Sequence, residues 1–211
     1  MNPANTCLIV VIMINFYTLG SARLTACIRA VALQGAMLAV LPILQFGFTE
    51  HTLLLFTGAL TLKGLLIPWL LMRTIREVNI HRDLEPIIGY VPTMIIGTLF
   101  TTAGFLFSDS LPLLDKHVGA LFIPASLSTL SAGLLLLMSR RKAITQVVGY
   151  LVMENGIFIF SIQLLDAMPA MVEAGILLDL LVGVFVMVIV MHHINRAFSD
   201  MNTERLSALK E

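Results

Sequence analysis

Glu154 and Asp179 each stand near the middle of a long apolar run, and Lys63 stands near the middle of a third. An ionisable side chain at the centre of a bilayer costs at least ~2.5–3.5 kcal/mol on insertion scales, so a plain anchor rarely keeps one. Burial and neighbouring opposite charges act on a carboxyl pKa in opposite directions, which lets buried acids exchange protons near neutral pH. The three residues therefore predict a path for protons or other cations.

The elements that carry these residues are predicted to be transmembrane helices. The chain has 211 residues, of which 58% are hydrophobic and 12% are charged, and its mean hydropathy is +0.94. A soluble domain of this size needs far more polar surface, so we expect a polytopic membrane protein. Met1–Thr6 holds no basic residue, and Arg23 follows the first apolar run, which is the reverse of the order in a secretory signal peptide.

Seven apolar runs of about 18–22 residues are each long enough to cross a hydrocarbon core of ~30 Å. The predicted fold class is all-α, with the N-terminus outside and the C-terminus in the cytoplasm. The predicted spans lie near residues 3–21, 28–48, 52–72, 86–107, 118–138, 144–165 and 170–192. We divide the chain into a four-helix region over 1–110, a three-helix module over 111–198, and a cytoplasmic tail over 199–211.

The orientation follows from the excess of lysine and arginine in alternate loops. Eleven basic residues fall on one side: Arg23, Arg29, Arg73, Arg76, Arg82, Arg140, Arg141, Lys142, Arg196, Arg205 and Lys210. The other side holds Lys116 with the acids Glu50, Asp109, Asp115 and Asp166. The basic side is therefore predicted to be cytoplasmic, and we expect the basic segment Arg73–Arg82 to contact partner proteins.

The three mid-membrane residues are predicted to share one layer. The last two spans form a hairpin that turns at Asp166–Pro169, with Glu154 about thirteen residues before the turn and Asp179 about eleven after it. At ~1.5 Å per residue, their depths differ by about one helical turn. Lys63 is central in its own span, so the layer indicates a relay along the membrane plane. Glu173 lies near the outer end and is either an entry group or simply hydrated.

Polar residues recur on the sixth predicted span. Tyr150, Glu154 and Ser161 are spaced as on one helical face, and Asn155 is adjacent to Glu154. We expect Tyr150, Asn155 and Ser161 to support Glu154, and Glu154 to face protein or water. In the next span Gly175 and Gly183 flank Asp179 on one face and admit a close neighbour. The alternative for each acid is a protonated hydrogen-bonding group between helices. A small-residue face on the fifth span predicts a helix contact through Ala125, Ser128, Thr129, Ala132 and Gly133.

Lys63 is too deep to reach the interface, because its side chain extends only ~6 Å while the interface is roughly 15 Å away. We expect it to form an ion pair or to face a water-filled pocket. Pro68 follows by five residues and removes the bond to the carbonyl of Gly64. This break either makes room near Lys63 or only bends the helix.

The run Gly149–Gly156, GYLVMENG, resembles the signature stretch of hydrogenase-4 component E, a membrane subunit of formate-hydrogenlyase-type complexes. The likeness covers essentially the whole chain. It continues through Thr61–Pro68, Met171–Gly175, the Asp179 segment, Val186–Val190 and Leu206–Lys210.

Residues 118–198 are also similar to the K subunit of NADH–quinone oxidoreductase and to its counterpart in multi-subunit cation/proton antiporters. The basic run Arg140–Lys142 matches the inner loop of that family, and Glu154 matches its first membrane glutamate. Asp179 stands where the second glutamate is expected and is one methylene shorter. The resemblance implies that both acids belong to a hydrophilic axis that links antiporter-like subunits to a redox module.

The resemblance implies a subunit of a group 4 nickel–iron hydrogenase complex in the inner membrane of a bacterium, with a role in proton translocation. No catalytic residue, metal ligand or cofactor is expected in this chain. The nickel–iron centre and iron–sulfur clusters are expected in hydrogenase-type large and small subunits, beside antiporter-like membrane subunits, and no nucleic acid is involved. The alternatives are a subunit of a cation/proton antiporter without a redox partner, and a structural clamp within such a complex.

Overall fold

The computed structural model describes residues 2–77, 87–110, 121–140 and 143–164, together with Gly175, Gly183 and Phe185. Every long regular element in this part of the chain is helical. The helices are α1 (Pro3–Gly20), α2 (Leu24–Phe46), α3 (Glu50–Ala59), the π-helical segment η1 (Leu60–Leu66), α4 (Ile67–Glu77), α5 (Tyr90–Ser110), α6 (Phe122–Ser139) and α7 (Ala143–Leu164).

Six helical stretches among the described residues are long and apolar enough to cross a membrane. They correspond to the first six predicted spans, and α3, η1 and α4 together make the third. The second begins at Leu24, a turn before the predicted residue 28, because Leu24–Cys27 continue the helix. The predicted seventh span, 170–192, lies outside the described residues except for Gly175, Gly183 and Phe185.

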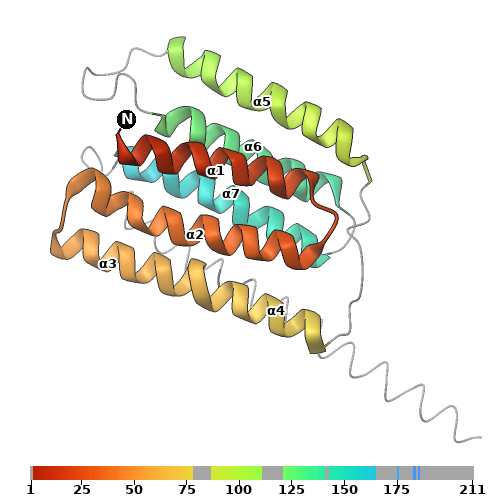
Figure 1. The fold of residues 1–211 in the computed structure, drawn as a ribbon, viewed down its shortest axis with the longest axis horizontal. Helices are drawn as coiled ribbons and strands as arrows, with labels where there is room; N and C mark the ends of the chain where they lie inside the picture. The colour runs from red at the N-terminus through yellow and green to blue at the C-terminus, as the bar shows by residue number, and fades with distance from the viewer. Residues whose placement is uncertain are drawn as a thin grey trace, which may run out of the picture.

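The helices run alternately in opposite directions (Figure 1). Helices α1, α2, α6 and α7 form the centre of the bundle, and α6 packs against α7 over much of its length. The α3–η1–α4 stretch covers α2 on one flank, and α5 lies along α6 on the other. This order places Arg23, Arg73 and Arg140 at one end and Glu50 and Asp109 at the other, as the predicted alternation of loops requires. Which end faces the cytoplasm stays a prediction.

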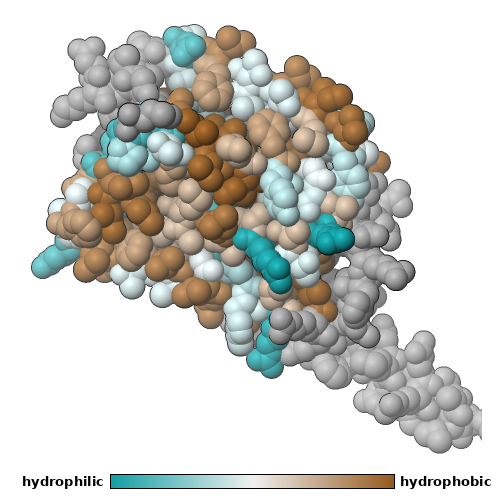
Figure 2. Space-filling model, in the orientation of Figure 1, coloured by the Kyte–Doolittle hydropathy of each residue, from teal (hydrophilic) through white to brown (hydrophobic). Residues whose placement is uncertain are grey.

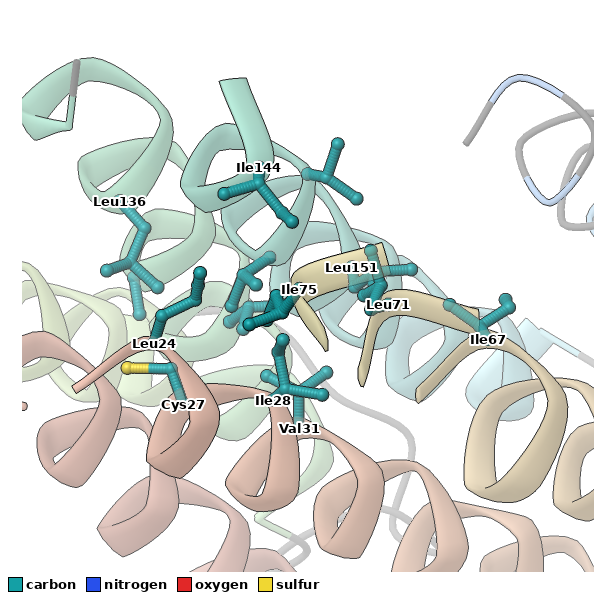
Figure 3. Packing of buried hydrophobic residues seen from close by; sticks show 14 of the residues in the cluster. Leu24, Cys27, Ile28, Val31, Ile67, Leu71, Ile75, Leu136, Ile144 and Leu151 are labelled. Atoms are coloured by element: carbon teal, nitrogen blue, oxygen red, sulfur yellow. The ribbon is translucent and has the colours of Figure 1, made fainter. Parts of the chain in front are cut away.

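Two clusters of buried apolar side chains hold the bundle together. The first lies toward the basic end and joins α1, α2, α4, α6 and α7, with Leu24, Ile28, Leu71, Leu136 and Leu151 among its members (Figure 3). The second lies toward the opposite end and joins α1, α2, α6 and α7. The site described below lies between these clusters.

The outer surface of the described helices is apolar as well. Figure 2 shows brown and pale residues over most of the visible face, with few hydrophilic ones. Large apolar side chains such as Trp69, Leu99 and Leu106 are more than half exposed. Exposed apolar surface of this extent is costly in water and favourable against lipid chains or a neighbouring membrane protein.

Helices α6 and α7 approach each other closely at glycines. A Cβ atom at Gly156 would lie 2.6 Å from the backbone nitrogen of Leu130, and one at Gly133 would overlap the backbone nitrogen of Met153. The predicted small-residue face of α6 is confirmed as a helix contact, because its members are buried against neighbouring helices. Since lipid chains are as apolar as leucine, close packing at small residues is a main source of helix association in membranes.

Candidate functional site

Lys63 is carried on a π-helical turn. The segment η1 spans Leu60–Leu66, and the amide of Ile67 donates to the carbonyl of Leu62, one residue further back than in an α-helix. Pro68 follows at once, and its ring blocks the regular bond to Gly64. The widened turn lies at the predicted break, and single π-helical turns inside α-helices frequently mark functional positions.

The structure pairs Lys63 with Glu154 of α7. The Nζ atom of Lys63 lies 3.2 Å from Oε1 of Glu154, and the two side chains are only 6% and 4% exposed. Of the two surroundings expected for Lys63, an ion pair or a water-filled pocket, the structure shows the ion pair, with Glu154 as the partner. In a low-dielectric interior such a pair is retained only when attraction and further polar contacts offset its desolvation.

A glycine of α2 lets η1 come close enough to form this pair. A Cβ atom at Gly35 would lie 2.9 Å from Cβ of Lys63 and 3.1 Å from its carbonyl oxygen. Such distances are too short for a real side chain, so any larger residue would push η1 away from α2. Gly35 thus fixes where Lys63 stands.

Phe158 of α7 also contacts the lysine. The Nζ atom of Lys63 lies 4.7 Å from the centre of the Phe158 ring, within the range of a cation–π contact. Glu154 and Phe158 are four residues apart on α7, so both face η1. The lysine therefore meets a negative charge and an aromatic face from the same helix.

A recess of about 60 Å³ borders the ion pair between α3, η1 and α7. This volume exceeds the ~10–15 Å³ that a water molecule needs. At Gly58 no described atom lies within 4 Å of where a Cβ would stand. Apart from Lys63 and Glu154, the described lining is apolar: Leu54, Leu55, Gly58, Ala59, Leu62, Ile67 and Phe158.

A chain of amide side chains crosses the bundle beside the pair. Nδ2 of Asn155 donates to Oε1 of Gln34 at 3.2 Å, and Nε2 of Gln34 donates to Oδ1 of Asn15 at 2.8 Å. Nδ2 of Asn15 then donates to the hydroxyl of Thr129 at 2.9 Å. These four residues, from α7, α2, α1 and α6, are all buried. Asn155 was predicted from the sequence as a supporting residue, whereas Gln34 and Asn15 were not.

The other predicted support residues lie at different places on α7. Tyr150 is half-buried against the first apolar cluster. The hydroxyl of Ser161 donates to the carbonyl of Ile157 on its own helix at 2.9 Å. Ser161 also lies beside Gly175, where a Cβ would be 3.7 Å from its Oγ. Asp179 and Glu173 lie outside the described residues.

Arg140 is buried at the end of α6, although the sequence predicted it in a basic loop. It is 1% exposed, and its Nη2 donates to the carbonyl of Leu19 at 3.0 Å. Its guanidinium lies 4.8 Å from the ring centre of Tyr90. The arginine thus satisfies a carbonyl left open at the end of α1, where a cation also complements the helix dipole.

The other expected surface feature, the basic segment Arg73–Arg82, is described only in part. Arg73 is exposed and lies 5.6 Å from the ring centre of Trp69, whereas residues 78–86 lie outside the described part. Over the residues that are described, no group of three or more His, Cys, Asp or Glu side chains is placed to hold one metal ion.

Comparison with known proteins gives two kinds of relative. The chain is 29% identical over 191 residues to an uncharacterized protein of Mycobacterium tuberculosis. The aligned region covers 89% of this chain and 87% of the relative. It is 28% identical over 163 residues to hydrogenase-4 component E of Escherichia coli strain K12, covering 76% of this chain and 74% of that protein. The component E of Shigella flexneri matches to the same extent.

No family model matches the chain, and no solved structure matches it. The six long apolar helices among the described residues, together with the similarity to hydrogenase-4 component E, indicate a multi-pass membrane protein.

Proposed function

We propose that this chain is a membrane subunit of an energy-converting, hydrogenase-type complex and that its Lys63–Glu154 pair carries protons at mid-membrane depth. The observation that carries the proposal is the pair itself, buried at 3.2 Å between a π-helical turn and α7. Intramembrane ionisable residues are costly, and they mark ion and proton paths more often than they serve packing. The similarity to hydrogenase-4 component E supplies the kind of complex.

The chemistry requires only that an O–H bond at Glu154 forms and breaks. When Glu154 takes up a proton its carboxyl becomes neutral, and its charge–charge attraction to the Lys63 ammonium is lost. The ammonium then stabilises the next negative charge within reach. When the proton leaves to water or to another carboxylate, the ion pair forms again. The recess beside the pair has the volume to admit water as the immediate donor or acceptor.

We propose Asp179 as the neighbouring carboxyl group, and Glu173 as an outer entry or exit group. Gly175 lies beside Ser161 of α7. If the segment continues as the antiparallel helix that the sequence predicts, Asp179 lies ~6 Å further inward than Gly175, and Glu154 lies ~10 Å inward from Ser161. The two carboxyls would then differ by less than one helical turn in depth.

The proposed partners are antiporter-like membrane subunits and hydrogenase-type large and small subunits, which would hold the nickel–iron centre and the iron–sulfur clusters. This chain would couple their redox reaction to proton movement without handling electrons itself. Its location would be the inner membrane of a bacterium.

Mass spectrometry of the complex that co-purifies with the chain from native membranes in mild detergent tests this assignment. A nickel–iron large subunit together with iron–sulfur proteins and antiporter-like subunits is the expected result. Antiporter-like subunits alone would instead identify a cation/proton antiporter. A chain that purifies alone would contradict membership of either complex.

A further inference from the structure

The buried amide chain beside the ion pair has one direction. Asn155 donates to Gln34, Gln34 donates to Asn15, and Asn15 donates to Thr129. The hydroxyl of Thr129 then donates to the carbonyl of Ala125 on its own helix at 2.7 Å. The three inner members each donate and accept once in sequence, so every hydrogen bond strengthens the next by polarisation.

Two dipeptides join this chain to the ion pair. On α7, Glu154 is followed by Asn155, and on α2, Gln34 is followed by Gly35. Gly35 is the contact that sets the position of Lys63, while Gln34 holds α2 to α7 through Asn155. The turn of α7 that holds Glu154 and the turn of α2 that holds Gly35 are therefore also joined by the hydrogen bond between Asn155 and Gln34. These two turns place the lysine against the glutamate.

We propose that the Asn155–Gln34–Asn15–Thr129 chain is the positioning element of the Lys63–Glu154 pair. It fixes the register of α2 against α7 and leaves Glu154 to exchange protons on its other side, beside the recess at α3. This inference deepens the proposed function and rests on it for the direction of proton exchange. The positioning itself rests only on the contacts described above.

The chemistry of the amide chain suits it to fixing the positions of the helices and not to conducting protons. Carboxamides have no protonation equilibrium near neutral pH, so the two amides between Asn155 and Thr129 do not pass a proton along. A buried amide that loses its partner is costly, which makes the arrangement of the four helices strongly specified. The recess, by contrast, has Lys63 and Glu154 as its described polar lining.

Infrared titration of the protonated carboxyl band of Glu154 tests the proposal in the purified complex. The band is identified as the one that Glu154→Gln removes. The test variants are Gln34→Leu, next to the pair, and Thr129→Val, three hydrogen bonds away from Asn155. The control is Ser126→Ala, since among the described residues the hydroxyl of this buried α6 residue donates to the carbonyl of Ile123 on its own helix and takes no part in the amide chain.

We expect Gln34→Leu to change the proton affinity of Glu154 about tenfold, which displaces its titration midpoint by about one pH unit. Thr129→Val is expected to change it at least about threefold, or roughly half a pH unit. Thr129→Ser, which keeps the hydroxyl, and Ser126→Ala are expected to keep the original midpoint. Thr129→Val also keeps the side-chain shape, so it decides the matter if Gln34→Leu does not accumulate.

Unchanged midpoints in both Gln34→Leu and Thr129→Val would overturn the positioning role, even if the variants were less stable. This outcome is distinct from failure of the proposed function. Full proton translocation by an assembled Glu154→Gln complex would remove the transport role of Glu154, whereas the infrared midpoint does not depend on translocation.

Discussion

At the scale of single residues, the cost of burying Lys63 and Glu154 explains much of the local architecture. Each charge is expensive alone in a low-dielectric interior, so the two must be held at contact distance. Gly35 lets the lysine approach, and Phe158 offers its aromatic face. Removing one of the two charges should therefore lower the free energy of unfolding more than removing both.

We predict that Lys63→Met lowers the free energy of unfolding in detergent by about 3–5 kcal/mol, because Glu154 loses its cation. The double variant Lys63→Met with Glu154→Gln should recover most of this loss. Unfolding titrations of the two single variants and the double variant measure the coupling. Additive losses would show that the two side chains do not depend on each other.

A second prediction concerns the buried Arg140. Arg140→Ala removes a large buried side chain and its hydrogen bond to the carbonyl of Leu19. It is expected to lower the free energy of unfolding by about 2–4 kcal/mol. Arg23→Ala, an exposed arginine at the same end of the bundle, is the control and should change stability by less than about 0.5 kcal/mol. Equal stability of the two variants in the same detergent titration would contradict the packing role of Arg140.

The sequence predicted the charged residues of the site, Lys63 and Glu154, but missed most of the residues that support them. Lys63 and Glu154 stand out because a charge within an apolar run is costly and is seldom kept without a function. Gln34 and Asn15 are polar interruptions of apolar runs too, and this signal was available. Their connection through Asn155 could not be predicted from the sequence, because residues more than a hundred positions apart meet only after the helices pack. The burial of Arg140 had no signal, since a basic run at a helix end is usually a solvated loop.

At the scale of elements, two local devices determine where the site lies. The π-helical turn before Pro68 positions Lys63, and the glycines between α6 and α7 bring the backbone that carries Glu154 close to α6. The sequence predicted both the break and the small-residue face, because proline and glycine act locally. The widening of the turn into η1, against which α2 packs, is seen only in the structure.

We predict that Gly133→Val separates α6 from α7 and destabilises the protein by about 1–3 kcal/mol, because its side chain would overlap the backbone at Met153. Gly58→Ala is the matched control, since no described atom lies within 4 Å of its new Cβ. Thermal stability in detergent measures both. A Gly133→Val protein as stable as Gly58→Ala would contradict the close packing.

At the scale of the whole molecule, the six described long helices expose apolar side chains outward and enclose the ion pair and the amide side chains of the site in the bundle. This arrangement suits a lipid environment, where buried polar groups must find partners inside the protein. The first six spans followed from hydropathy alone. Their lateral order, with α5 on one flank and the α3–η1–α4 stretch on the other, did not, because hydropathy carries no information about neighbours.

The predicted orientation is open to a direct test. Single cysteines introduced at Arg23 and at Asp109, in a background with Cys7 and Cys27 replaced, should react with an impermeant thiol reagent from opposite sides. Arg23→Cys is expected to react only in inverted vesicles, and Asp109→Cys only from outside intact spheroplasts. The reverse pattern would show that the basic end of the bundle faces outward.

The central claim is that Glu154 carries protons, and proton translocation by the assembled complex tests it most directly. In inverted membrane vesicles, Glu154→Gln should leave the complex assembled and reduce coupled translocation at least about tenfold, whereas Glu154→Asp should retain part of it. Full coupled translocation in an assembled Glu154→Gln complex would contradict the account. Loss of assembly itself in that variant would instead favour the structural clamp.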